Sequence, residues 1–190
     1  MNARRRLVLS ALTTIGALLG ALGCAGSGPS PTAAASASAP ASAPAGFGGT
    51  DLAWIEITIA MDEQLLPLLT LAPERGGDPT VTALAGQVRT FTETELAALR
   101  SLHDEAGLPA QNPHEGMTMP GMVTADEVAQ AAKLTGRPFD AFARQKIAEA
   151  SRQGKSLAES EQRYGVEPRT RALAANAVSA RTRTLSSLPG

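Results

Sequence analysis

The chain has 190 residues but few of the side chains on which catalysis usually depends. Because it has only one cysteine, it cannot form an intramolecular disulfide. With one cysteine and two histidines, it also has few residues that could form a catalytic nucleophile–base pair. There is no glycine-rich phosphate loop and no zinc-ligand spacing, and Ser151 and Ser160 have no histidine in their own predicted helix. We therefore predict that the protein is not an enzyme and that it acts by binding.

The chain also lacks an N-terminal apolar run long enough to span a membrane. The uncharged run at residues 7–22 is shorter than the roughly 20 residues that a transmembrane helix needs. Three arginines precede it, an arrangement typical of a secretory signal. The run ends in Ala21-Leu22-Gly23-Cys24, which resembles a bacterial lipobox, whose cysteine is lipidated after cleavage in front of it. We predict a signal peptide at residues 1–23, a lipid anchor at Cys24, and a location outside the cytoplasm at the cell membrane.

The segment after the signal contains no charged residue. From residue 25 to residue 49 it consists almost entirely of Ala, Ser, Pro and Gly, which cannot bury enough apolar surface to offset chain entropy. We predict a tether at residues 24–49 and one folded domain at residues 50–190. Loss of the signal would change the formal charge from −1 to −4, a total that does not indicate a nucleic-acid partner.

Two long helices are predicted in the first half of the domain, because apolar residues recur there at spacings of three and four. The first helix covers residues 51–71 and the second residues 78–106, the latter beginning with Asp-Pro and ending before a glycine. One carboxylate interrupts each apolar stripe, Asp62 in the first and Glu95 in the second. A short helix is predicted in the following connector at residues 125–134.

The second half of the domain repeats the first. Two further helices are predicted at residues 139–164 and 168–188. A constant offset of 89 residues relates Asp51 to Asp140, Pro79 to Pro168, Leu84 to Leu173 and Leu99 to Leu188. Four such helices bury their apolar stripes most simply as a four-helix bundle. We therefore predict an all-α domain built from two repeated helical hairpins with a long crossover.

Several motifs resemble a known bacterial family. The sequence Gly-Met-Thr-Met-Pro-Gly-Met-Val-Thr begins at Gly116, Gly-Arg-Pro-Phe-Asp-Ala-Phe begins at Gly136, and Ala-Leu-Ala follows a proline at residues 83–85 and 172–174. From residue 51 to residue 188 the chain is similar to domain of unknown function family 305. The resemblance implies a ferritin-like four-helix bundle.

The chain departs from that family where metal binding is concerned. Members usually carry a His-His pair on the first helix of each repeat and Gln, Glu and Met on the second, and copper binding has been inferred from these residues. The matching positions hold Met61-Asp62 and Ala150-Ser151 on the first helices. On the second helices they hold Thr92, Glu95 and Leu99 in one repeat and Arg181, Thr184 and Leu188 in the other. The resemblance therefore implies that the bundle site is largely lost here.

Asp62 and Glu95 remain candidates for a metal site in the bundle. Inward carboxylates on neighbouring helices are costly unless they bind a cation, share a proton or meet an arginine. A di-iron centre is not expected, because the chain contains no Glu-x-x-His motif. The alternative is that both acids lie near the rim of the bundle, solvated or paired with Arg181 or Lys146.

The connector offers a second candidate site, for copper. His114, Met117, Met119 and Met122 lie within nine residues, and thioether sulfur selects Cu(I) over harder ions. Their spacings of three, two and three would let a loop wrap around one cuprous ion outside the cytoplasm. The alternative is that these methionines fill gaps against the bundle, as methionine often does.

Charge is distributed unevenly between the two halves. Residues 50–127 contain 13 acidic and three basic residues, whereas residues 138–190 contain nine basic and five acidic ones. This difference would help the hairpins to dock. Alternatively, the last helix could present a basic face to anionic headgroups or an acidic partner protein, through Arg169, Arg171, Arg181 and Arg183. The sequence thus supports a lipid-anchored binding protein with residual copper binding or, as the alternative, a metal-free protein-interaction module.

Overall fold

The computed structural model describes residues 46–188, so the predicted signal peptide, Cys24 and most of the predicted tether lie outside the described residues. The described part contains five helices, which are α1 (Gly49–Arg75), α2 (Pro79–Glu105), α3 (Ala125–Ala131), α4 (Arg137–Tyr164) and α5 (Pro168–Ser186). No strand occurs between residues 46 and 188, and the predicted all-α class is confirmed. Over the same residues, no helix is both long and apolar enough to cross a bilayer.

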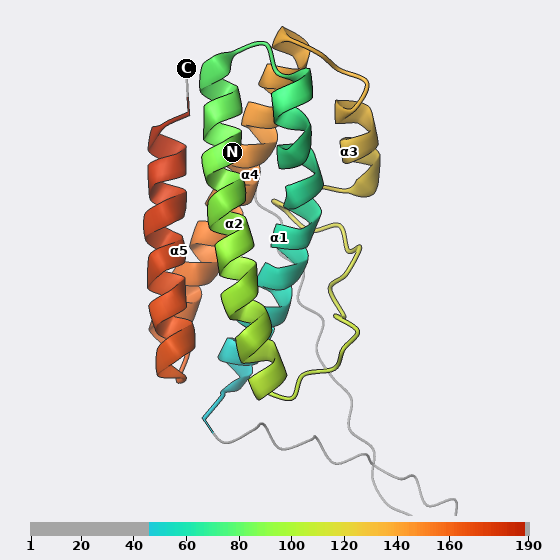
Figure 1. Ribbon diagram of the computed structural model, residues 1–190. Coiled ribbons are helices and arrows are strands. Elements are labelled where there is room, and N and C mark those ends of the chain that lie inside the picture. Colours follow the sequence, from blue (N-terminus) through green and yellow to red (C-terminus); the bar gives the residue numbers. More distant parts are fainter. Residues whose placement is uncertain (1–45, 189–190) are drawn as a thin grey trace, which may run out of the picture. The chain divides into compact units, whose positions relative to one another are not determined.

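The four long helices pack side by side as two hairpins (Figure 1). Helices α1 and α2 form the first hairpin and α4 and α5 the second, while α1 also packs against α4. The long connector between the hairpins runs beside α1 and contains the short helix α3 (Figure 1). This is the arrangement of hairpins and crossover that the repeat predicts, whereas the more specific ferritin-like assignment stays a prediction.

Helices α2 and α5 begin in the same way, as expected from the repeat. The Asp78 carboxylate accepts a hydrogen bond from the backbone N–H of Thr80 at 2.8 Å, and Glu167 accepts one from that of Thr170 at 2.9 Å. A proline follows each capping acid, and its restricted φ and missing N–H suit the first helical position. The same local chemistry therefore starts the second helix of both hairpins.

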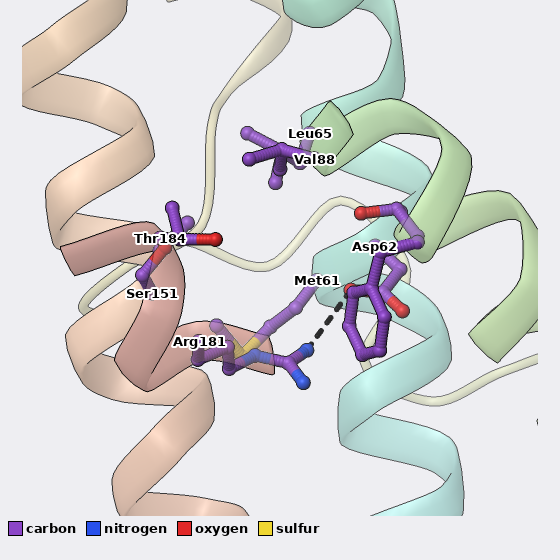
Figure 2. A pocket seen from close by; sticks show the side chains of 10 residues that line it. Met61, Asp62, Leu65, Val88, Ser151, Arg181 and Thr184 are labelled. Atoms are coloured by element: carbon purple, nitrogen blue, oxygen red, sulfur yellow. Dashed lines mark hydrogen bonds and ion pairs between the residues drawn. The ribbon is translucent and has the colours of Figure 1, made fainter. Parts of the chain in front are cut away.

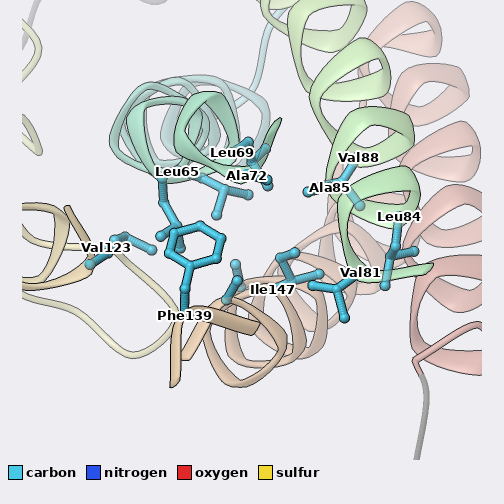
Figure 3. Packing of buried hydrophobic residues seen from close by; sticks show 14 residues of the cluster. Leu65, Leu69, Ala72, Val81, Leu84, Ala85, Val88, Val123, Phe139 and Ile147 are labelled. Carbon is cyan, nitrogen blue, oxygen red and sulfur yellow. The ribbon is translucent and has the colours of Figure 1, made fainter. Parts of the chain in front are cut away.

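Apolar side chains from the four long helices fill the space between them. One cluster joins α1, α2 and α4 around Phe139 and Ile147, which are fully buried (Figure 3). A second cluster, which also includes α5, surrounds Ile55 and Leu99. Phe47 belongs to the second cluster and is only 6 % exposed. Burial of such a side chain contributes about 1.5–3 kcal/mol, so Phe47, at the end of the predicted tether, helps to hold the start of the chain against the bundle.

Two equivalent aspartates join the hairpins at opposite ends of the bundle. Asp140, near the start of α4, accepts hydrogen bonds from the backbone N–H of Gly77 in the α1–α2 turn at 3.1 and 3.2 Å. Asp51, near the start of α1, accepts them from the N–H groups of Val166 and Glu167 in the α4–α5 turn at 3.1 and 3.0 Å. The offset of 89 residues relates both the two acids and the two turns. Each repeat therefore caps the turn of the other, and the bundle has an approximate twofold relation.

Candidate functional site

A buried arginine, Arg181, meets two buried acids at the centre of the bundle. Figure 2 shows its contact with one of them, Asp62. One terminal nitrogen of Arg181, on α5, lies 2.9 Å from Oε1 of Glu95, on α2. The other lies 2.8 Å from Oε2 of Glu95 and 3.3 Å from Oδ1 of Asp62, on α1. The exposed fractions of Arg181, Asp62 and Glu95 are 8, 2 and 1 %, so solvent ions screen these charges very little. Arg181 is thus the counter-ion of both acids.

Two neighbours position the side chain of Arg181. Its guanidinium carbon lies 5.5 Å from the centroid of the Phe91 ring, in cation–π geometry. Gly154, on α4, provides the space, because a β-carbon at that position would collide with Nε of Arg181. The repeat places Leu65 at the equivalent position of α1, so only the second repeat has room for an arginine here.

Burial is the main influence on the protonation of this centre. It raises the pKa of Asp62 well above its ordinary range, and the charge of Glu95 raises it further, whereas Arg181 lowers it. Burial alone would lower the pKa of Arg181, but the attraction of Glu95 and Asp62 raises it. Arg181 therefore stays charged, and Asp62 binds a proton more readily than an exposed aspartate does.

A small cavity lies beside this group (Figure 2). Its volume is about 20 Å³, enough for about one water molecule. Besides Asp62 and Arg181, its polar lining consists of Thr92, Ser151 and Thr184. Thr92 is the repeat-equivalent of Arg181, and Ser151 that of Asp62. Equivalent residues of the two repeats therefore meet at one point, where the space is too small for a substrate or an organic cofactor.

The structure corrects two predictions about these charges and confirms a third, the pairing of the acids with Arg181. Asp62 and Glu95 do not lie near the rim of the bundle, since both are buried at its centre. Arg181 pairs with them, whereas Lys146 pairs with Glu127 at 2.7 Å on another part of the bundle. Arg181 is consequently absent from the basic surface that we predicted for the last helix.

The connector is held against the side of the bundle. Asn112 Nδ2 donates a hydrogen bond to the backbone oxygen of Glu56, on α1, at 2.8 Å, and Asn112 Oδ1 accepts one from the N–H of His114 at 2.8 Å. Gly121 has a φ of +82°, and a β-carbon there would clash with Gln153 on α4. Glycine is therefore needed at this close approach between connector and helix.

The four predicted copper ligands lie in different surroundings. Met122 is 5 % exposed and packs with Met61 and Met119. Met117 is 44 % exposed, and His114 is half-buried, with no hydrogen-bond partner for Nδ1 among the described residues. Between residues 46 and 188, no group of three or more His, Cys, Asp and Glu side chains is placed to hold a metal ion. The structure thus groups Met119 and Met122 with Met61 and leaves Met117 at the surface.

The profile of a family described as "Domain of unknown function (DUF305)" matches residues 51–189. The chain belongs to the DUF305 family. Two solved structures share its fold, a predicted secreted DUF305 protein of Streptomyces coelicolor with a TM-score of 0.64 and a DUF305 fragment of Deinococcus radiodurans with a TM-score of 0.66. The Streptomyces protein is 21 % identical to this chain, and the match covers 73 % of this chain and 89 % of the Streptomyces chain. The Deinococcus fragment is 16 % identical, and its match covers 75 % of this chain and 94 % of the fragment. No curated protein sequence matches the chain.

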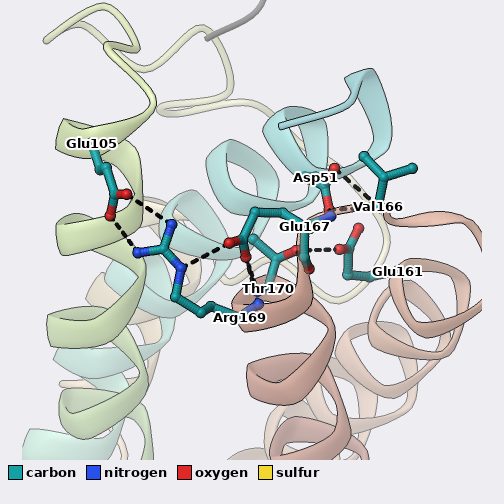
Figure 4. A network of polar contacts seen from close by, with 7 residues as sticks. All are labelled: Asp51, Glu105, Glu161, Val166, Glu167, Arg169 and Thr170. Atoms are coloured by element: carbon teal, nitrogen blue, oxygen red, sulfur yellow. Dashed lines mark hydrogen bonds and ion pairs between the residues drawn. The ribbon is translucent and has the colours of Figure 1, made fainter. Parts of the chain in front are cut away.

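The DUF305 domain contains a second cluster of buried acids, at the end of the bundle where α1 begins (Figure 4). Thr170 Oγ1 lies 2.7 Å from Oδ1 of Asp51 and 2.7 Å from Oε1 of Glu161, and all three residues are buried. A hydroxyl group has one hydrogen, so it cannot donate to both carboxyl groups. Because Thr170 Oγ1 also lies 2.9 Å from the backbone oxygen of Glu167, at least one of the two contacts with the acids requires a proton on a carboxyl group.

The pKa values identify Glu161 as the acid that carries this proton. Burial raises the pKa of Glu161 to about 7, and although Thr170 opposes the shift, the nearby Asp51 carboxylate adds to it. Burial would also raise the pKa of Asp51, but hydrogen bonds from Thr170, Glu161 and the backbone lower it to about 2. Below pH 7, Glu161 is therefore the neutral partner and Asp51 the charged one.

Sequence reasoning missed the roles of Gly154, Glu161 and Thr170. A signal existed for Arg181, because the repeat aligns it with Thr92, on the inward face of the second helix. No such signal marks Gly154, since the side chain that needs its space comes from another helix. Glu161 and Thr170 face each other across the α4–α5 turn, and they meet Asp51 only when this hairpin closes onto the start of α1.

Removal of Arg181 will leave two buried acids without a counter-ion. We expect Arg181→Leu to lower the free energy of unfolding by about 3–5 kcal/mol, as measured by urea denaturation of the mature chain. The loss should shrink as the pH falls, because protonation removes the buried charge, and added Asp62→Asn and Glu95→Gln substitutions should restore much of it. Arg183→Leu, at an exposed position of the same helix, should cost less than about 0.5 kcal/mol. Equal losses at both arginines would contradict this account.

The stability of the DUF305 domain will decrease as the pH rises toward 7, because Glu161 then loses its proton. Its folded-state pKa is raised, so its contribution is complete below its ordinary value of 4.5 and is lost as the pH rises through about 7. Thermal unfolding across this interval should show a smaller decrease for Glu161→Gln than for the unmodified chain. Glu74→Gln, at an exposed position, serves as the control. An unchanged pH profile in Glu161→Gln would show that another group is responsible.

Proposed function

We propose that this DUF305 protein is an extracytoplasmic, lipid-anchored binding module whose bundle is stable without a metal ion. The proposal rests above all on the contact of Arg181 with Asp62 and Glu95, because a covalently attached cation occupies the space between the two acids. The remaining cavity has a volume of about 20 Å³. Binding would therefore take place on the surface of the domain and not inside the bundle.

The proposed location is supported by the N-terminal sequence. Residues 1–23 have the form of a secretory signal, and Cys24 stands at the lipidation position of a lipobox-like sequence. The DUF305 relative from Streptomyces coelicolor is itself predicted to be secreted. A lipid at Cys24 would hold the mature protein on the outer face of the membrane.

Removal of metal ions should leave the folded domain unchanged. A resident metal present at 100 times its Kd would contribute about 2.7 kcal/mol to stability, so that its removal would lower Tm by several degrees. We expect the mature chain to have the same Tm before and after dialysis against EDTA and a Cu(I) chelator, measured by circular dichroism. The Arg181→Leu variant serves as the matched control. Its Asp62 and Glu95 have no counter-ion, so added divalent cations should raise its Tm. A decrease in Tm after chelation that persists when Met61, Met119 and Met122 are replaced by leucine would overturn the metal-free bundle.

A second candidate function is Cu(I) binding by methionine sulfur in the connector. The observation that favours it is the packing of Met119 and Met122 against Met61, which brings soft thioether ligands into one cluster. His114, with its unpartnered Nδ1, and the exposed Met117 are the other predicted ligands. Copper would then be held beside α1 and outside the bundle centre.

A competition titration with a colorimetric Cu(I) chelator tests this candidate. We expect one equivalent of Cu(I) to be withheld from the chelator by the mature chain. Leucine at positions 61, 119 and 122 should abolish this binding, whereas His114→Ala with Met117→Leu should retain most of it if the cluster supplies the ligands. Loss only in the second variant would place the site at the exposed end of the connector. Absence of binding in the unmodified chain would leave the methionines as packing residues.

A further inference from the structure

One end of the bundle combines the start of the folded chain with exposed apolar side chains. Tyr164 is 66 % exposed and Val166 is 62 % exposed, and both lie at the turn between α4 and α5. Among the described residues, Met117 is the only other large apolar side chain with such exposure. Val166 adjoins Gly48, where a β-carbon would lie 2.8 Å from Cγ2 of Val166. The exposed side chains are thus next to the point at which the chain enters the bundle.

The Asp51 carboxylate connects the segment where the chain enters the bundle to the α4–α5 turn. It accepts a hydrogen bond from the N–H of Gly48 at 2.6 Å on the side of the incoming chain. On the other side it accepts hydrogen bonds from Val166 and Glu167 at 3.1 and 3.0 Å (Figure 4). A buried carboxylate with several such bonds is a rigid support. The turn therefore presents Tyr164 and Val166 in a fixed position relative to the incoming chain.

Two exposed arginines, Arg163 and Arg171, flank the turn. The guanidinium carbon of Arg163 lies 5.9 Å from the centroid of the Tyr164 ring. Arg163 and Arg171 are exposed and form no ion pair with the described residues, whereas Arg169 pairs with Glu105 at 2.6 Å. Arg169, one of the arginines predicted to form a basic face on the last helix, therefore already has a partner on α2.

We propose that this end of the bundle rests on the surface of the membrane that carries the lipid at Cys24. Tyr164 and Val166 would enter the headgroup region, where an aromatic ring with a polar tip is favoured, and Arg163 and Arg171 would meet anionic headgroups. The proposal rests on the proposed lipid anchor.

The covalent structure of the chain supports this orientation. The 22 residues from Cys24 to Ala45 span at most about 75 Å even when fully extended, and they join the bundle at the end that carries the turn. Helix α1 has 27 residues, so the opposite end, near Gly77, lies about 40 Å further away. A lipid at Cys24 would therefore bring the turn into contact with the membrane more often than the opposite end of the bundle.

A thiol probe on the full mature chain tests the proposal. A lipidated Cys24 has no free thiol, so an introduced cysteine is the only site for labelling. Val166→Cys and, at the opposite end, Glu74→Cys are labelled with an environment-sensitive fluorophore and reconstituted in vesicles of phosphatidylethanolamine and phosphatidylglycerol. We expect a lipid spin-labelled near its headgroup to quench the probe at position 166 several-fold more strongly than the probe at position 74. Combined Arg163→Gln and Arg171→Gln substitutions should weaken this quenching.

Each other outcome overturns the proposal in a distinguishable way. Equal quenching at both positions would mean that the turn does not contact the membrane, although the anchor could be intact. Labelling of the chain without an introduced cysteine would mean that Cys24 is free, and both the anchor and the docking would then be wrong. A blue-shifted probe at position 166 without quenching by lipid would mean that a second copy of the chain covers the turn.

Discussion

The contact of Arg181 with Asp62 and Glu95 constrains the whole bundle. A buried ion pair adds little net stability compared with an apolar core, but loss of one partner leaves charge buried and unpaired at a cost of about 3–5 kcal/mol. The arginine belongs to the second hairpin and both acids to the first. The hairpins therefore cannot separate or slide without breaking this contact. The unequal charge of the two halves of the sequence thus has a structural consequence at the centre of the fold.

The frame of the bundle is symmetric, but its chemistry is not. Asp51 and Asp140 cap the turns of opposite hairpins in equivalent ways. At the centre, the repeat-equivalent positions hold different residues, with acids at 62 and 95 in the first repeat and hydroxyl side chains at 151 and 184 in the second. Arg181 fits because Gly154 takes the place that Leu65 has in the first repeat. The centre of the bundle therefore holds an internal ion pair that the repeat does not duplicate.

In the binding module that we propose, the filled centre leaves the surface for binding, and two surface regions are candidates. The connector lies along α1 and brings Met119 and Met122 against Met61. The α4–α5 turn exposes Tyr164 and Val166 at the end where the chain enters. Both places depend on contacts between distant segments, the first on the approach of Gly121 to α4 and the second on Asp51. We regard the bundle as a rigid support for these two surfaces.

The sequence by itself determined the all-α class, the four long helices within a few residues, the connector between two hairpins, and the place of Asp62 and Glu95 on apolar stripes of their helices. These features follow from the spacing of apolar residues, from caps such as Asp78-Pro79 and from the repeat, all of which are read along one segment at a time. Only the tertiary structure decided that Arg181 reaches the two acids, that Glu161 carries the proton beside Asp51, and that Met122 packs on Met61. Each of these contacts joins helices or loops far apart in sequence, and a shift of one helix by a single turn, about 5.4 Å, would separate the partners. Periodicity specifies which face of a helix is buried, whereas packing between helices specifies which side chains meet there.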